Sequence, residues 1–313
     1  MAKNMYQKRE ERKQNKLKDE DQGGVQKNVI NWYPGHMVKA TNEIRDSLRL
    51  IDIVIEVLDS RIPKSSQNYI IDEMAEGKEK IVVLNKADIA DKQELIKWKE
   101  YYESKGIYVV LTNAQEGNNI SKLLDIIKLV GNKIYEKKYE NKKIEITPIY
   151  RALIVGIPNV GKSTIINKIS NKNSANVGNK PGVTVRKQWI RVGTNIELLD
   201  TPGLLWPRLE DNNAGLKLAL TGNIKQEILD VQELAVAGIK LLVGIDKYRL
   251  MLKEKYKLID LDFEKTDYEI LEEIGRKRGC LISKGEIDLN KTSKIFLDDF
   301  KNGRIGKISL DLI

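Results

Sequence analysis

The chain has 313 residues, of which 41% are hydrophobic and 32% charged, and its formal net charge at pH 7 is +9. This length allows one large core and a smaller second domain, because single cores stop growing near about 250–300 residues. No stretch approaches the ~20 apolar residues of a membrane span, and the single cysteine, Cys280, excludes an internal disulfide framework. We therefore expect a protein of the reducing cytoplasm with no membrane partner.

Residues 1–28 hold eight basic and five acidic side chains and almost nothing to bury. We expect this basic extension to be disordered, because it has too little apolar surface to offset the entropy of ordering. It also lacks the apolar segment of a secretory signal. The positive charge of the whole chain favours a polyanionic partner such as RNA, although a merely solvated basic surface is the alternative interpretation.

From residue 29 onwards helix-like and strand-like segments alternate. Helical spacing is found at Val38–Leu50, Tyr69–Gly77, Gln93–Ser104, Ile120–Lys138 and Lys162–Ser170. Strands rich in β-branched residues are expected at Ile51–Asp59, Lys80–Asn85, Ile107–Thr112, Tyr150–Gly156, Lys187–Val192 and Asn195–Leu199, the last two joined by a hairpin turn. This alternation predicts an α/β fold with a doubly wound, mostly parallel sheet.

From about residue 212 the strand signal stops, and amphipathic helices are expected at Ala214–Leu220, Gln226–Leu242, Asp267–Arg278 and Lys291–Phe300. The predicted organisation is therefore a nucleotide-binding domain over residues 29–211 and a helical RNA- or ribosome-binding domain over residues 212–313. Residues 214–313 contain 18 basic and 17 acidic side chains, so only a local cluster could contact phosphates. Arg276-Lys277-Arg278 is the candidate, and a solvated helix end is its alternative interpretation.

The segment GIPNVGKST, at residues 156–164, is a G-x-x-x-x-G-K-S loop between an expected strand and an expected helix. Its backbone N–H groups and the positive end of the helix would surround the phosphates of a nucleotide. Lys162 would reach the β- and γ-phosphates, and the Ser163 hydroxyl would bind Mg²⁺. The nucleotide-binding residues expected in this loop are Asn159, Val160, Gly161, Lys162, Ser163 and Thr164.

Two further segments complete the phosphate site. DTPG, at residues 200–203, ends an expected strand, so Asp200 suits a carboxylate that holds Mg²⁺ through water, and the N–H of Gly203 suits the γ-phosphate. The PGVT segment, at residues 181–184, lies between the phosphate loop and DTPG in a polar stretch that is typical of a mobile loop. Thr184 is the natural switch threonine, contributing its hydroxyl to Mg²⁺ when a triphosphate is bound.

The sequence Asn85-Lys86-Ala87-Asp88 follows an expected strand and matches the N-K-x-D motif that reads guanine. The Asp88 carboxylate can accept hydrogen bonds from N1–H and the exocyclic amine of guanine, a pair of donors that adenine lacks. Asn85 would contact the base and tie this loop to the phosphate site, with the stem of Lys86 against the ring. After the next strand, Asn113 and Ala114 would complete the base site.

The order of these motifs is unusual, because the base-reading motifs at residues 85 and 112 precede the phosphate motifs at residues 156, 184 and 200. Ordinary GTPases run the other way. A permuted core still closes if the old termini are joined, here by residues 120–149. The sequence therefore predicts a circularly permuted P-loop GTPase with a C-terminal helical domain. We expect nucleotide state to reach that domain through residues 204–213.

Several motifs together resemble the YlqF/RbgA family of ribosome-assembly GTPases. They are WYPGHM (32–37), IDIVIEVLDSRIP (51–63), GIPNVGKST (156–164), PGVT (181–184) and LLDTPGLLWP (198–207). The resemblance runs from about residue 29 to the C-terminus. It implies a GTPase that acts late in assembly of the large ribosomal subunit, binds rRNA and is stimulated by the particle. The basic extension departs from the family, whose members start close to WYPGHM.

The resemblance also bears on catalysis, since Leu204 occupies the position of a water-orienting glutamine. His36, the only histidine, lies in the PGHM segment that the family uses instead, and an imidazole is able to orient water. A histidine that only packs the first helix is the alternative. Asn159 resembles the asparagine of K⁺-stimulated relatives, which implies a K⁺ ion beside the phosphates.

The expected protein is thus a monomeric GTPase that uses Mg²⁺, with K⁺ as an additional candidate, and whose partners are the large ribosomal subunit and its rRNA. The catalytic residues expected are His36, Lys162 and Thr184. Two alternatives stay open at this point. One is an RNA-binding scaffold under nucleotide control with negligible hydrolysis, and the other is a permuted GTPase that serves a different RNA.

Overall fold

The computed structural model describes residues 35–139, 148–172, 188–203, 212–224, 230–259 and 265–313. Trp32 to Ile313 form one compact unit. The basic extension, Thr184 with its PGVT segment, and Leu204 all lie outside the described residues. So does most of the connection at residues 204–213, and the domain boundary at residue 212 stays a prediction.

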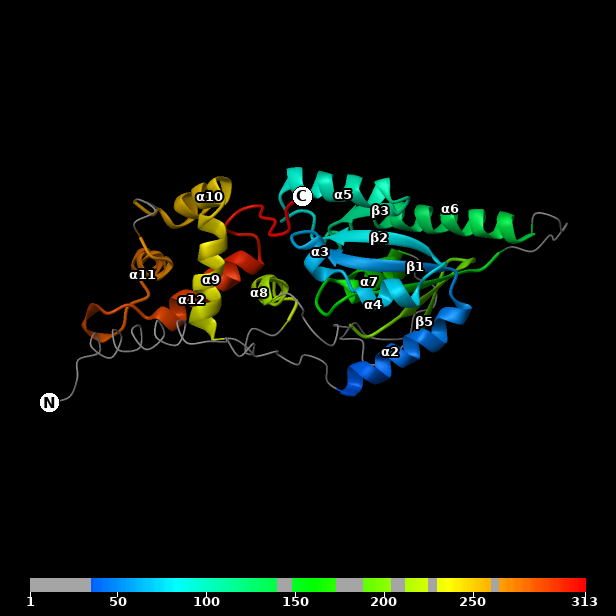
Figure 1. Ribbon diagram of the computed structural model, residues 1–313, viewed down its shortest axis with the longest axis horizontal. Helices are drawn as coiled ribbons and strands as arrows, with labels where there is room; N and C mark the ends of the chain where they lie inside the picture. Colours follow the sequence, from blue (N-terminus) through cyan, green and yellow to red (C-terminus); the bar gives the residue numbers. More distant parts are fainter. Residues whose placement is uncertain (1–34, 140–147, 173–187, 204–211, 225–229, 260–264) are drawn as a thin grey trace, which may run out of the picture. The chain divides into compact units, whose positions relative to one another are not determined.

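A six-stranded sheet forms the centre of the nucleotide-binding half, with strand order β3-β2-β1-β4-β6-β5 (Figure 1). Its strands are β1 (Ile53–Asp59), β2 (Glu79–Asn85), β3 (Tyr108–Thr112), β4 (Tyr150–Val155), β5 (Gln188–Val192) and β6 (Ile196–Asp200). All neighbours are parallel except β5 and β6, which form an antiparallel hairpin. The predicted α/β fold with its mostly parallel sheet is confirmed.

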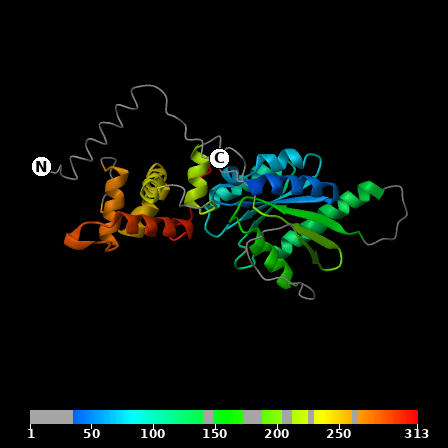
Figure 2. The ribbon, with the colours of Figure 1, turned by 90° about the horizontal axis from the view of Figure 1, so that it is seen from below.

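Helices cover both faces of the sheet because its central strands are mostly apolar on both sides. On β1, Ile53, Ile55 and Val57 belong to one buried cluster, whereas Val54 and Leu58 point to clusters on the other face. The first face is covered by α6 (Ile120–Tyr139) and α7 (Lys162–Lys172). The second is covered by α2 (Gly35–Ser47), α4 (Tyr69–Met74) and α5 (Lys92–Ser104). Figure 2 shows the strands between the blue and cyan helices and the green ones.

The C-terminal part is helical, as predicted. Its helices are α8 (Asn212–Leu220), α9 (Val231–Val243), α10 (Asp246–Tyr256), α11 (Asp267–Lys277), the short η3 (Ser283–Gly285) and α12 (Leu289–Lys301). Helix α10 was not expected from the sequence, because it is dominated by charged residues. It buries only a narrow stripe, Tyr248, Leu252 and Tyr256, spaced four residues apart. Two other short helices, η1 (Leu48–Leu50) and α3 (Pro63–Ser66), lie beside β1 in sequence.

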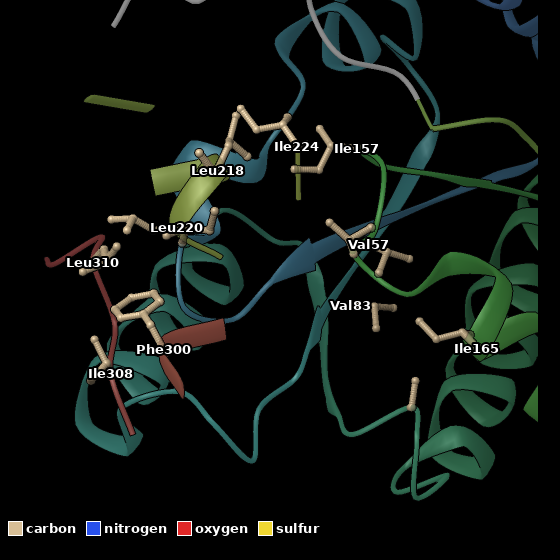
Figure 3. Close-up of a cluster of buried hydrophobic side chains, with 14 of the residues drawn as sticks. Val57, Val83, Ile157, Ile165, Leu218, Leu220, Ile224, Phe300, Ile308 and Leu310 are labelled. Carbon is tan, nitrogen blue, oxygen red and sulfur yellow. The ribbon is translucent and has the colours of Figure 1, made fainter. Parts of the chain in front are cut away.

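One buried cluster runs without interruption from the sheet into the helical part (Figure 3). It contains Val57 of β1, Ile157 of the phosphate loop and Ile224, which follows α8. It also contains Phe300 of α12 and Leu310 near the C-terminus. The two parts of the chain therefore share apolar packing at the end of the sheet where the phosphate loop begins.

Candidate nucleotide site

The phosphate loop leaves β4 and enters α7, as the motif requires. Its two glycines have backbone conformations that other residues rarely adopt, since φ is +149° at Gly156 and +105° at Gly161. A Cβ atom would lie 2.5 Å from the Val57 carbonyl oxygen at Gly156 and 2.2 Å from Asn85 Nδ2 at Gly161. The loop therefore packs so closely on β1 and on the N-K-x-D segment that a side chain at either glycine would displace its neighbours.

Lys162 is the charged side chain of this loop and is only 7% exposed. Its Nζ donates hydrogen bonds of 2.9 Å to the carbonyl oxygens of Gly156 and Ile157. Burial lowers the pKa of Lys162 to about 8, although the negative charge of Asp200 opposes that shift. The ammonium group of this lysine is thus poorly hydrated and belongs to the first residue of α7, a position suited to binding phosphate.

Asp200 and Gly203 lie beside this loop, as predicted. Asp200 ends β6 and is 2% exposed, and the next residue, Thr201, donates its hydroxyl to the carbonyl oxygen of Ile154 at 2.8 Å. A Cβ atom on Gly203 would lie 2.7 Å from the backbone nitrogen of Pro158. A carboxylate and the nearby Ser163 hydroxyl are hard oxygen ligands, so this donor set fits Mg²⁺.

Asn85 joins the base-reading segments to the phosphate loop. Its Nδ2 donates to the Val160 carbonyl oxygen at 2.7 Å. Its Oδ1 accepts from the Thr112 hydroxyl at 2.9 Å and from the Ala114 N–H at 3.0 Å. One buried amide therefore fixes three segments that are far apart in the sequence. The N–H of Ala114, a residue expected to complete the base site, donates to Asn85 here.

The remaining base-site residues differ in burial. Asp88 is exposed, so its carboxylate is accessible to a base, whereas Asn113 is buried and its Oδ1 accepts from the N–H groups of Gln115 and Glu116. Asn113 thus shapes its own turn. Lys86 has φ +61°, and its ammonium group pairs with Asp59 Oδ2 at 2.8 Å.

Asp59 and Arg61 lie in the IDIVIEVLDSRIP segment, and the sequence alone assigns neither residue a role of its own. In the structure, both are central to this region. Both side chains are buried, and Arg61 Nη2 lies 2.8 Å from Asp59 Oδ2. Burial alone would raise the pKa of Asp59, but the positive charges of Arg61 and Lys86 hold it well below its usual range. Asp59 at the end of a mostly apolar strand, with Arg61 two residues later, is the signal that could have identified them.

Two other candidates have different surroundings. The backbone of His36 lies in the first turn of α2, and its side chain is outside the described residues, so its catalytic role stays a prediction. Asn159 has φ +58° and donates from Nδ2 to the Gly222 carbonyl oxygen at 3.2 Å. Its amide thus contacts the helical part, and the K⁺ assignment stays a prediction.

The Arg276-Lys277-Arg278 cluster is exposed at the end of α11. Arg278 is less accessible to a phosphate group, because its guanidinium pairs with Asp299 at 3.1 Å and lies over the ring of Tyr256.

Among the helices that the structure describes, none has the length and apolar composition of a membrane span.

The base-reading loops enter the fold before the phosphate loop yet close onto it through Asn85, which places the protein in the class of circularly permuted P-loop GTPases. Residues 151–274 match the family described as 50S ribosome-binding GTPase. The Ribosome biogenesis GTPase A of Bacillus cereus is 44% identical over 283 residues, which cover 90% of this chain and 94% of that protein. The chain belongs to the ribosome biogenesis GTPase A (YlqF/RbgA) family, and it is a GTP hydrolase.

Solved structures agree with this assignment. The GDP-bound structure of TM YlqF has a TM-score of 0.57 and 28% identity, covering 86% of this chain and 98% of that one. The crystal structure of GNP-bound YlqF from T. maritima has a TM-score of 0.55 and 28% identity, covering 88% of this chain and 98% of that one.

Proposed function

We propose that this GTPase acts in late assembly of the large (50S) ribosomal subunit and binds rRNA in a nucleotide-dependent way in the cytoplasm. The observation that carries the nucleotide part is the Asn85 amide, which holds the Val160 carbonyl and the Ala114 N–H together. The ribosomal part is supported by a relative named Ribosome biogenesis GTPase A, which this chain matches over 94% of that protein's length.

In the proposed site, guanine lies against the Lys86 stem and is selected by the exposed Asp88 carboxylate. The phosphates lie along the N–H groups of residues 159–164, with Lys162 and the N-terminus of α7 stabilising their negative charge. Ser163, Asp200 and Thr184 would hold Mg²⁺, which supplies a positive charge that neutralises charge developing on the phosphates. Gly203 and Thr184 would sense the γ-phosphate.

His36 is the proposed water-orienting group. Hydrolysis transfers the γ-phosphoryl group to water and releases GDP and inorganic phosphate, so the attacking water must be held in line with the bond that breaks. An imidazole at the N-terminal end of α2 has the chemistry to do this, and Asn159 is the proposed ligand of an activating K⁺. The protein is proposed to act as a monomer.

GTP turnover with and without purified large ribosomal subunits tests this proposal. In K⁺ buffer, we expect subunits to accelerate turnover by the intact protein and His36→Ala to lose that acceleration while retaining GTP binding. The same assay in Na⁺ buffer tests the K⁺ assignment. Turnover that ignores the subunits would remove the ribosomal role, and an unaltered His36→Ala variant would remove the role of the histidine.

Co-sedimentation tests nucleotide dependence separately. We expect the protein to sediment with free large subunits in the presence of a GTP analogue and to stay in the supernatant with GDP. Equal binding in both states would exclude a nucleotide-dependent interaction. Subunit binding in the triphosphate state without any turnover would favour the scaffold alternative instead.

A further inference from the structure

The carboxylate of Asp59 and the guanidinium of Arg61 form a two-point ion pair inside the protein. Arg61 Nε donates to Asp59 Oδ1 at 2.9 Å, and Nη2 donates to Asp59 Oδ2 at 2.8 Å. Asp59 is 0% exposed and Arg61 1% exposed. Such a planar fork fixes the direction of the arginine, so its remaining N–H groups point in defined directions.

Those remaining N–H groups reach the helical part of the chain. Nη1 of Arg61 donates to the carbonyl oxygen of Lys301 at the end of α12, at 2.9 Å. Nη2 also donates to the carbonyl oxygen of Thr221, just after α8, at 3.0 Å. Both acceptors are backbone atoms of helix ends, which have carbonyl groups without partners in their own helix. Arg61 thus donates hydrogen bonds to the C-terminal ends of two helices that lie far from it in the sequence.

The same Asp59 carboxylate reaches the base-reading loop. Its Oδ2 accepts from Lys86 Nζ at 2.8 Å and from Asn223 Nδ2 at 3.1 Å. Asn223, also fully buried, donates in addition to the Thr221 hydroxyl at 2.8 Å. One carboxylate oxygen therefore touches both the lysine of the N-K-x-D motif and a side chain of the helical part.

The turn at residues 221–223 has the geometry that makes these contacts possible. The Asn223 N–H donates to the Leu218 carbonyl oxygen and the Gly222 N–H to that of Ala219, which is a Schellman ending of α8. Gly222 has φ +73°, and a Cβ atom there would lie 2.7 Å from the Lys301 side chain. The Gly222 carbonyl oxygen accepts from Asn159 of the phosphate loop. A single turn thus contacts the phosphate loop and the Asp59–Arg61 pair.

The C-terminal segment makes a second connection to the same loops. The Leu310 N–H donates to the Arg61 carbonyl oxygen at 2.7 Å, and the Ile308 N–H donates to that of Ile89 at 3.2 Å. Ile89 directly follows Asp88. The base-reading loop therefore contacts the helical part directly through its backbone, and indirectly through the contacts of Asp59 with Lys86 and Asn223.

We propose that Asp59, Arg61 and Asn223 form a coupling element that positions Lys86 for the guanine base and links nucleotide binding to the packing of the helical part. This inference rests on the proposed function, since it assigns Lys86 to the base. Because coupling between sites is reciprocal, a nucleotide that holds Lys86 in place also stabilises the contacts of Arg61 and Asn223 with the helical part. Arg61 and Asn223 are positioning residues, and neither is assigned to the reaction.

The test is a set of GDP affinities measured with a fluorescent GDP analogue. We expect Asn223→Ala and Arg61→Lys each to weaken GDP binding by roughly 5–20-fold, within the usual range of coupling between sites. Asn302→Ala is the matched control, because the side-chain amide of this asparagine, in the same helical part, donates to Asp298 within its own helix turn. The control should bind GDP like the intact protein.

A double-mutant cycle with Lys86→Met separates coupling from general damage. In the Lys86→Met background, we expect Asn223→Ala to weaken GDP binding by less than about 2-fold, because the route through Lys86 is already absent. An equal loss in both backgrounds would overturn the coupling. Hydrogen exchange gives an independent readout: GDP should slow exchange of the Ile308 and Leu310 N–H groups in the intact protein, and less so in Asn223→Ala.

The coupling element and the guanine site can be excluded separately. GDP binding by the intact protein that neither Asn223→Ala nor Arg61→Lys alters would overturn the coupling element and leave the nucleotide site standing. An intact protein that binds no GDP would overturn the proposed guanine site and the coupling element with it. A loss of binding in Asn302→Ala equal to that in Asn223→Ala would also overturn the coupling.

Discussion

The sheet core and the junction between the core and the helical part are stabilised by opposite kinds of residues. In the core, β1 contributes apolar side chains to two faces, with the buried Glu56, which pairs with Lys80, as the exception, and its neighbours pair with it in parallel register. At the junction, charged groups are buried instead: Asp59 with Arg61, and Asp311 with Lys217. The core depends on apolar area, which tolerates small changes, whereas the junction depends on paired charges, which do not.

This difference has a functional consequence. The core presents loops at the carboxyl ends of its strands, and the junction determines where the base-reading loop lies relative to the helical part. A buried ion pair adds little net stability, but it fixes the relative positions of its two side chains, because leaving either charge buried without its partner costs free energy. Substitutions at the two regions should therefore differ in kind as well as in size.

The largest expected loss of stability is that of Arg61→Ala. Removing this guanidinium takes away its two hydrogen bonds to the buried Asp59 carboxylate, and it also removes a donor from the carbonyl oxygens of Lys301 and Thr221. We expect the free energy of unfolding to fall by about 3–5 kcal/mol, the usual effect of removing one partner of a buried pair. Urea denaturation followed by circular dichroism measures it. Ile55→Val in the core, which removes one methylene, should cost only about 1 kcal/mol, and an equal loss in the two variants would contradict the comparison.

Lys162→Ala should separate chemistry from stability. Its ammonium group is the buried positive charge of the phosphate loop, so its removal takes away stabilisation of charge on the phosphates. We expect GTP turnover to fall by roughly 100- to 1000-fold, as for other groups that stabilise a charged transition state. The unfolding midpoint should change little, because within the described residues the lysine donates its hydrogen bonds to carbonyl oxygens of its own loop. Turnover within about 3-fold of the intact protein would exclude this role.

The sequence predicts the core better than the junction for a physical reason. Runs such as residues 80–85 and the P-loop are local signals, whose residues are neighbours in the chain, and the strands and the loop formed where they were expected. The junction joins residues far apart, such as Ser65 with Asp311, and no local pattern marks them. The charged helix α10 was missed for a similar reason, because only its tertiary contacts show which narrow face is buried.

The candidate site divides in the same way. The contact of Asn85 with the phosphate loop and the place of Asp200 at the end of β6 agree with what the motifs predict. The pairing of Lys86 with Asp59 was not predicted, since the motif indicates that the lysine stem lies against the base and leaves the partner of the ammonium group open. Ala114 is a similar case, because the direction of a backbone N–H depends on the Asn85 side chain that it meets.

Gly161→Ala should weaken the link between the two halves of the nucleotide site. A Cβ atom there would lie 2.2 Å from Asn85 Nδ2 at a φ of +105°, so the substitution combines strain with a clash. We expect a loss of about 2–4 kcal/mol in stability from these two effects together, together with weaker GDP binding. Gly193→Ala is the matched control, since its φ is +61° and nothing lies within 4 Å. Thermal unfolding of both variants measures the difference, and equal losses would show that backbone strain alone is responsible.

Among the substitutions at the junction, Asp311→Ala at its edge should have a smaller effect than Arg61→Ala. This carboxylate, 4% exposed, accepts from the Ser65 N–H at 2.6 Å and the Ser65 hydroxyl at 2.8 Å and pairs with Lys217 at 2.7 Å. Its loss should cost about 2 kcal/mol, as for hydrogen bonds to a charged group. Asp298→Ala removes a pair with Arg304 that is more than half exposed, and it should leave the urea midpoint unchanged, because water replaces the partner. If both substitutions have the same effect, burial does not distinguish the junction from the surface.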